Sequence, residues 1–217
     1  MLHTVPGLVN DMEALAQKAI PDLRVLHYVD ESLLQDTIAK GTTPAHVRRR
    51  LVNYASYAEE SGAQALLVSC SSIGEAATAA QDFAAIPIMR IDAPMAELAV
   101  ASGTRIGVLA TLSATLGPTT RLVQEAAMRQ SKKPSITATE VGGAFSALRA
   151  GDRAMHDGLV LAAFSELAAQ CDVVVLAQAS MARVIEHSRD QPGGPAVLAS
   201  PDSGMTQLRS HFSSQDS

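Results

Sequence analysis

The chain alternates between short apolar runs and longer stretches in which apolar residues recur every three or four positions. The short runs have the length and composition of β-strands, whereas the longer stretches have the period of helices that bury one face. The predicted strands are residues 1–5, 22–29, 65–69, 86–91, 105–110, 135–141, 172–177 and 196–199. Strands that alternate with helices are typical of parallel sheets covered by helices on both faces.

Helices are predicted between most of these strands. They cover residues 9–20, residues 44–60, a segment that follows Cys70, and residues 113–129, 143–150, 152–170, 179–187 and 203–212. Thr43 is placed to cap the helix at 44–60, and Pro44 fits its first turn. Residues 30–42 are expected to form a loop that helps to set the size of a pocket.

The two halves of the chain repeat one scheme, because the intervals between strands run short, long, short in both. The expected fold class is α/β, with two pseudo-symmetric lobes that each contain a four-stranded parallel sheet flanked by helices. We expect an N-terminal α/β lobe at residues 1–93, completed by a C-terminal helix at 201–217, and a second α/β lobe at residues 94–200.

Composition narrows the class of protein. The chain has 217 residues, of which 47% are hydrophobic and 18% charged, as expected of a folded, soluble protein. Its net charge of −5 provides no broad basic field, so no nucleic-acid partner is expected. No apolar run approaches the roughly 18 residues of a membrane span, so we expect no membrane association and a cytoplasmic protein. Two cysteines cannot form a disulfide framework.

The stretch from Ala65 to Gly74 carries the sharpest chemical signal. A buried strand ends there at Cys70, two serines follow, and an Ala-rich helical pattern begins. The first N–H groups of a helix have no partners within the helix, so this junction favours anions and thiolates and is expected to lower the pKa of the thiol. The alternative is that Cys70 only fills the core, which is the role expected of Cys171 at the start of a strand.

Polar residues follow four of the predicted strands. They are His3 and Thr4; Cys70, Ser71 and Ser72; Thr111, Ser113 and Thr115; and Gln178 and Ser180. Ligands of open α/β sheets bind beyond the carboxyl ends of the strands, so these residues would converge on one cleft if the two lobes face each other. The Ser and Thr residues could instead cap helices, and His3 could be an ordinary surface residue.

The strand at 172–177 and the residues after it line up without gaps on the strand that leads to Cys70. In this alignment Gln178 matches Cys70, and Ser180 matches Ser72. The chain has no glycine-rich dinucleotide or phosphate-loop motif and no His or Cys spacing suited to zinc. Nucleotide binding and zinc chemistry are therefore poorly supported by the sequence.

Several of these segments together resemble the aspartate/glutamate racemase superfamily, which includes hydantoin racemases, maleate isomerases and arylmalonate decarboxylases. The segments are His3-Thr4-Val5-Pro6, Ser69-Cys70-Ser71-Ser72-Ile73-Gly74, Ile91-Asp92-Ala93-Pro94-Met95, residues 106–115 with the Thr111 and Thr115 pair, and Leu176-Ala177-Gln178-Ala179-Ser180-Met181. The resemblance extends over nearly the whole chain. It implies a pseudo-twofold pair of lobes with the active site between them and no cofactor.

The resemblance also implies roles for single residues. Family members typically carry one cysteine on each lobe, one thiolate removing the α-proton and the other thiol returning a proton on the opposite face. Cys70 matches the first cysteine, whereas Gln178 stands where the second is expected, and an amide does not exchange a proton near neutral pH. The residues expected to contact the substrate are His3, Thr4, Ser71, Ser72, Thr111, Thr115, Ala179 and Ser180.

The sequence thus predicts a cofactor-independent racemase or isomerase that acts at the α-carbon of a small carboxylate or a related cyclic compound. Cys70 is the expected acid/base, and Gln178 would bind substrate or order a water. Two alternatives stay open at this point: a one-base decarboxylase for a malonate-like acid, and a carboxylate-binding protein without activity. The expected partner is the small carboxylate itself, with assembly into a homo-oligomer as a further possibility.

Overall fold

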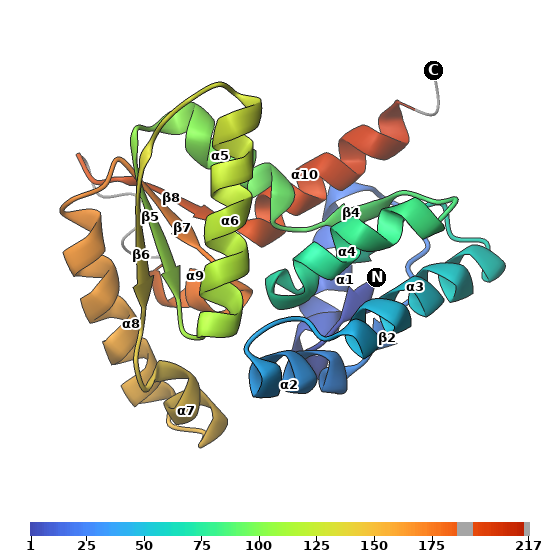
Figure 1. The fold of residues 1–217 in the computed structure, drawn as a ribbon, viewed down its shortest axis with the longest axis horizontal. Helices are drawn as coiled ribbons and strands as arrows, with labels where there is room; N and C mark the ends of the chain where they lie inside the picture. The colour runs from blue at the N-terminus through green and yellow to red at the C-terminus, as the bar shows by residue number, and fades with distance from the viewer. Residues whose placement is uncertain (186–192, 215–217) are drawn as a thin grey trace. The chain divides into compact units, whose positions relative to one another are not determined.

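The structure is a computed structural model that describes residues 1–185 and 193–214. It contains two four-stranded sheets, each within its own compact part of the chain (Figure 1). We call these parts unit 1, residues 1–93 and 201–217, and unit 2, residues 94–200. The described strand pairs are all parallel, which confirms the predicted α/β class with two parallel sheets flanked by helices.

The sheet of unit 1 has the strand order β2-β1-β3-β4. Its strands are short: β1 Leu2–His3, β2 Tyr28–Val29, β3 Leu66–Val68 and β4 Ile88–Arg90. The helical segments are η1 Pro6–Leu8, α1 Val9–Ala19, α2 Glu31–Lys40, α3 Ala45–Glu60, η2 Ser71–Ile73, α4 Gly74–Ala80, η3 Gln81–Phe83 and, beginning at the unit boundary, α10 Ser200–Ser213.

Strand β3 connects the two cores of unit 1. Leu66 and Val68 pack with residues of α2, α3 and α4, whereas Leu67 packs with residues of α1 and α10. Successive side chains of a strand point to opposite faces of the sheet, so a continuous apolar run is buried on both sides. This burial fixes where β3 ends and therefore where Cys70 lies.

The sheet of unit 2 has the strand order β6-β5-β7-β8. The strands are β5 Arg105–Ala110, β6 Ser135–Glu140, β7 Val173–Leu176 and β8 Ala196–Ala199. The helices are α5 Ala93–Ser102, which begins at the unit boundary, α6 Ser113–Arg129, α7 Ala144–Arg149, α8 Arg153–Ala168 and α9 Ala179–Ile185. Residues 186 and 187 of the predicted ninth helix lie outside the described residues.

The side chains of β7 alternate between the two cores of unit 2 in the same way. Val173 and Val175 belong to the core formed with α5 and α6, whereas Val174 and Leu176 belong to the core formed with α8 and α9. Helices α6 and α8 accordingly lie on opposite sides of this sheet in Figure 1. Cys171 is buried in the second of these cores, at the start of β7, as expected of a core residue.

Two local predictions were wrong. The strand expected at 22–29 is reduced to the two residues of β2. Residues 30–42 are mostly helix α2 rather than a loop. The Asp30 side chain caps this helix by accepting from the Ser32 N–H, and Gly41 ends it with a φ of 68°. The Asp30 cap and the left-handed Gly41 are ordinary signals of helix boundaries, which the period of the apolar residues did not reveal.

Thr43 does not cap α3. Pro44 occupies the N-cap position, and no side chain caps the helix there. The Thr43 hydroxyl instead donates to the carbonyl of Ser72, at 3.4 Å, in the turn that follows Cys70. The residue predicted to start a helix therefore contacts the candidate active site.

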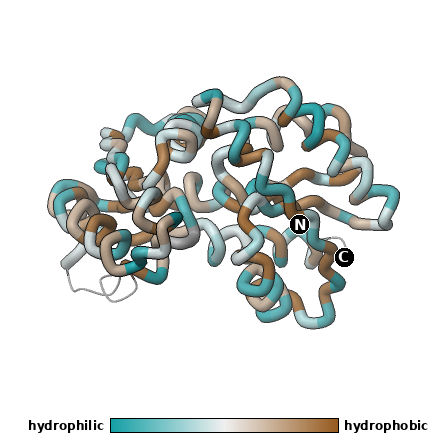
Figure 2. Tube along the Cα trace, turned by 90° about the horizontal axis from the view of Figure 1, so that it is seen from below, coloured by the Kyte–Doolittle hydropathy of each residue, from teal (hydrophilic) through white to brown (hydrophobic). Residues whose placement is uncertain are grey.

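Hydrophobic and hydrophilic residues interchange along the coloured part of the trace in Figure 2, as expected when the helices bury one side each. Among the described helices, none combines the length and the hydropathy needed to cross a bilayer.

Candidate active site

Cys70 lies just past the carboxyl end of β3, in residues 70–74, which we call the cysteine turn. The hydroxyls of Thr4 and Ser72 and the backbone N–H groups of Ser72 and Ile73 face its sulfur and favour the thiolate. The Ile73 N–H also donates to the carbonyl of Cys70 at 3.3 Å. Thr4 directly follows β1, which is hydrogen-bonded to β3. Unit 1 therefore brings together three of the predicted site residues, and Ser71 lies buried in the same turn.

Burial raises the pKa of the Cys70 thiol above its ordinary value, even though part of the residue remains accessible. The hydrogen bonds to the sulfur act in the opposite direction but do not outweigh the loss of water around it. The expectation that a helix N-terminus lowers this pKa was therefore wrong. The helical segments after Cys70 have only three and seven residues, so little helix is present to favour the thiolate.

In unit 2 the predicted residues Thr111 and Gln178 contact each other. The Oε1 atom of Gln178 accepts from the Thr111 backbone N–H at 2.6 Å and from its hydroxyl at 2.9 Å. A backbone N–H can only donate, so the atom that faces it must be the amide oxygen, and this fixes the orientation of the amide. The Nε2 group has no hydrogen-bond partner among the described residues and is left as a donor.

The remaining predicted residues of unit 2 are less informative. Thr115 is buried in the first turn of α6, where its N–H donates to the carbonyl of Leu112. Ala179 and Ser180 begin α9, but their side chains lie outside the part of the chain that the structure describes. Ser113, also considered from the sequence, is exposed at the start of α6.

His3 has partners within unit 1 and is fully buried. Its Nδ1 atom lies 2.9 Å from the Ser69 hydroxyl, which donates to a backbone carbonyl, so Nδ1 carries the proton that Ser69 accepts. Its Nε2 atom, 2.9 Å from Nδ1 of His27, then accepts a hydrogen bond from that ring. The His3 ring is neutral in this network, and both of its nitrogens are occupied, so His3 has no free position for a ligand.

Stability should depend on pH through His3. Burial, together with the nearby positive charges of the Met1 amine and His27, lowers the pKa of His3 from 6.5 to about 4. Between these values the unfolded chain binds the proton more readily, so stability is complete above about pH 6.5 and falls as the pH drops toward 4, by on the order of 2–3 kcal/mol. Urea unfolding at pH 7 and pH 4.5 measures this loss.

His3→Gln should remove most of the His3 contribution. The free energy of unfolding should then differ less between pH 7 and pH 4.5 than it does in the unchanged protein. His46→Gln is the matched control, because His46 is exposed and, among the described residues, hydrogen-bonds only Asp36, whose side chain is 41% exposed. Equal pH dependence of the His3→Gln and His46→Gln proteins would contradict the assignment.

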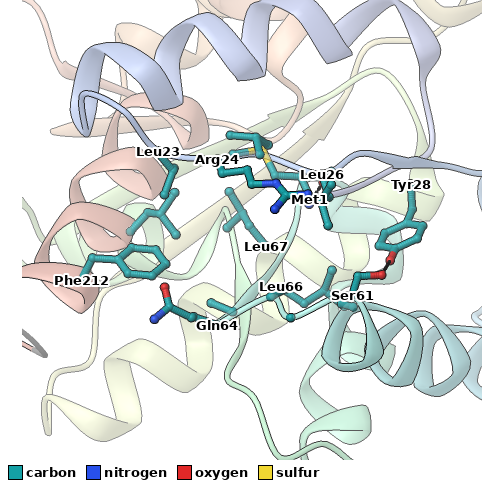
Figure 3. A pocket seen from close by; sticks show the side chains of 16 residues that line it. Met1, Leu23, Arg24, Leu26, Tyr28, Ser61, Gln64, Leu66, Leu67 and Phe212 are labelled. Carbon is teal, nitrogen blue, oxygen red and sulfur yellow. Dashed lines mark hydrogen bonds between the residues drawn. The ribbon is translucent and has the colours of Figure 1, made fainter.

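A pocket of about 290 Å³ in unit 1 lies at the amino ends of the strands, opposite the end that Cys70 follows (Figure 3). Met1, Gln64 and Leu66 in its wall stand at the amino ends of β1 and β3, whereas Cys70 follows the carboxyl end of β3. Figure 3 shows mostly apolar side chains around it, including Leu23 and Phe212. This pocket is therefore distinct from the candidate active site.

Two residues beside the cysteine turn were missed in the sequence. Arg90 ends β4, and its guanidinium forms a buried ion pair with Asp92. Asp92 was noted only within a segment that carries the family resemblance, without a partner. The available signal was an arginine at the end of an apolar strand, because a buried charge of this kind requires a partner.

Among the described residues, no group of three or more His, Cys, Asp or Glu side chains is arranged to hold a metal ion. The chemical groups at the two strand ends are a thiol, hydroxyls, backbone N–H groups and one oriented amide. Such groups can transfer one proton and can bind the oxygens of a carboxylate.

Comparison with known proteins places the chain in a family of racemases. The sequence profile of the Asp/Glu/hydantoin racemase family matches residues 4–208. The chain belongs to the Asp/Glu/hydantoin racemase family. No curated protein matches the chain in sequence.

Solved structures share the fold at low sequence identity. A glutamate racemase of Bacillus anthracis matches with a TM-score of 0.74 and 15% identity, over 99% of this chain and 80% of that one. An aspartate racemase of Picrophilus torridus matches at 0.67 and 14%, over 96% and 92%. An allantoin racemase of Klebsiella pneumoniae matches at 0.61 and 14%, over 99% and 86%. At such identities the likeness shows the fold alone.

Proposed function

We propose that this protein is a cofactor-independent isomerase-type enzyme that acts at the α-carbon of a small carboxylate, with Cys70 as its one acid/base. Gln178 is the proposed hydrogen-bond donor of unit 2 for a carboxylate. The proposal is supported above all by the Gln178 amide, whose oxygen is held by Thr111 and whose Nε2 group is left to donate. Family membership supports the substrate class, since relatives of this fold act on glutamate, aspartate and allantoin.

The proposed reaction begins with the Cys70 thiolate. It removes the α-proton, and the electron pair of the C–H bond moves into the substrate as an enolate. The donors around the sulfur stabilise the negative charge on the carboxylate oxygens. Because Gln178 cannot deliver a proton near neutral pH, inversion requires water as the second proton donor, whereas return from Cys70 gives exchange with retention.

Decarboxylation of a substituted malonate is the second candidate, because it needs one proton transfer on one face. The C–C bond to one carboxylate breaks, carbon dioxide leaves, and the enolate takes a proton from the Cys70 thiol. Water then reprotonates the thiolate. The absence of a second thiol at residue 178 and the raised pKa of Cys70, which keeps the thiol protonated at neutral pH, both favour this reaction.

Incubation in deuterated water separates these functions. The panel contains both enantiomers of glutamate and aspartate, allantoin, and a disubstituted malonate. Deuterium at the α-carbon, with or without inversion, supports the isomerase, and carbon dioxide release from the malonate supports the decarboxylase. Saturable binding without either reaction would instead identify a carboxylate-binding protein and refute the proposed activity.

Gln178→Glu tests the donor. The carboxylate keeps both hydrogen bonds from Thr111 but loses the NH₂ group and adds a negative charge. We expect KM for the anionic substrate to rise at least about tenfold, since a charged ligand loses a hydrogen bond and gains repulsion. Steady-state kinetics measure the change.

Gln124→Glu is the matched control, because it introduces the same charge at an exposed position of α6. It should leave KM within about twofold, since exposed charges are well screened. Unchanged kinetics in the Gln178→Glu protein would exclude Gln178 from substrate binding.

A further inference from the structure

An arginine and an aspartate are buried together in unit 1. Arg90 is 8% exposed and Asp92 is 1% exposed. The Nε and Nη2 atoms of Arg90 donate to the two carboxylate oxygens of Asp92 at 2.9 and 3.0 Å. Two parallel hydrogen bonds fix the plane of the guanidinium, so it has little freedom to turn.

The guanidinium lies against the backbone of Gly74, the last residue of the cysteine turn. A Cβ atom added to Gly74 would be 2.5 Å from Cζ and Nη2 of Arg90 and 2.6 Å from Nε. These distances are far below van der Waals contact, so Arg90 in this position requires a residue without a side chain at 74. Gly74 has a φ of −61°, which any residue adopts, so glycine is needed there for space and not for its conformation.

The cysteine turn is thus held at two places. The Thr43 hydroxyl donates to the carbonyl of Ser72, and Arg90 packs on Gly74. Between these contacts, the turn presents two backbone N–H groups to the sulfur. A shift of the backbone at either place would move these donors relative to the thiol.

We propose that Arg90, held by Asp92, is a positioning residue for Cys70, and that its contact with Gly74 sets the backbone donors of the cysteine turn against the sulfur. Arg90 acts through the turn and does not touch the substrate. This inference rests on the proposed function of Cys70 as acid/base.

Gly74→Ala displaces the guanidinium while it keeps every charge of the site. The methyl group forces Arg90 or the turn to move by about 1 Å to reach ordinary contact. A misplacement of that size lowers rates by up to about 100-fold, so we expect kcat to fall about 10- to 100-fold while KM changes less than threefold.

Alkylation of Cys70 by iodoacetamide, followed over pH, is the second readout and needs no substrate. Loss of donors to the thiolate should move the midpoint of the profile upward by about 0.5–1 pH unit in the Gly74→Ala protein. The measurement is made in a Cys171→Ala background so that a single thiol reacts. A change that only loosened the fold would expose the thiol to water and move this midpoint downward, because burial is what raises the pKa of Cys70.

Gly158→Ala is the matched control, because an added Cβ at this helical position meets nothing within 4 Å. Gly74→Ala combined with Arg90→Lys is the rescue, since the slimmer side chain keeps its charge beside Asp92 and leaves room for the methyl group. We expect the alkylation midpoint of the double variant to return at least half of the way to that of the protein without these two substitutions. If Gly74→Ala does not fold, Arg90→Lys alone is measured for the same shift.

A normal alkylation midpoint in Gly74→Ala, or no recovery in the double variant, would overturn the positioning role. The two proposals fail separately. If the midpoint shifts but the unchanged protein shows neither exchange nor decarboxylation, the positioning role stands and the enzymatic proposal is refuted. If the midpoint of Gly74→Ala is normal and the unchanged protein is fully active, the enzymatic proposal stands and the positioning role is refuted.

Discussion

Cys70→Ser is expected to abolish the reaction at the α-carbon, with kcat/KM reduced by about 10²- to 10⁴-fold. A serine hydroxyl has nearly the same size as the thiol but cannot ionise near neutral pH, so it can neither remove nor return the proton. Deuterium exchange or carbon dioxide release from the substrate found in the panel measures the loss. Wild-type rates in the Cys70→Ser protein would end the acid/base assignment.

Cys171→Ala provides the control. Cys171 is buried in the core of unit 2, so its substitution should leave activity within about twofold.

The pH dependence of the unchanged protein distinguishes the two candidate reactions. Since burial raises the pKa of Cys70, exchange by its thiolate should grow about tenfold per pH unit from neutral pH upward. Decarboxylation uses the protonated thiol and should instead decline at high pH.

Asp92→Ala should cause the largest loss of stability among the variants considered, about 3–5 kcal/mol. The substitution leaves the buried Arg90 guanidinium without its carboxylate, and an unpaired buried charge costs more than the pair contributes. Urea unfolding followed by circular dichroism measures the change.

Asp36→Ala is the comparison, because the ion pair of Asp36 with His46 has both side chains more than 40% exposed. It should cost less than about 1 kcal/mol. Equal losses for Asp36→Ala and Asp92→Ala would mean that solvent reaches Arg90 and that its pairing is not a buried one.

The period of the apolar residues was enough to locate β5, β8 and α6 at their observed bounds. It failed at α2, where the boundaries depend on the capping of Asp30 and the left-handed Gly41 rather than on an apolar stripe. It also overestimated the strand at 22–29, because apolar side chains there pack against the unit 1 core without joining the sheet.

At the candidate site, residue positions could be predicted but their partners could not. Thr111 and Gln178 were each expected after the end of a strand, and the observed pairing of β5 with β7 brings them into contact. The pairing of His3 with His27 depends on the register of β1 with β2. The raised pKa of Cys70 depends on burial in the folded chain, which no local motif reports.

The two hydrogen bonds from Thr111 to the Gln178 oxygen affect the entropy of ligand binding. A free glutamine loses rotamer freedom when a ligand orders it, at a cost of about 1–2 kcal/mol. Here two hydrogen bonds select the rotamer before any ligand arrives. A ligand that accepts from Nε2 thus meets a preorganised donor, and its affinity is not reduced by ordering this side chain.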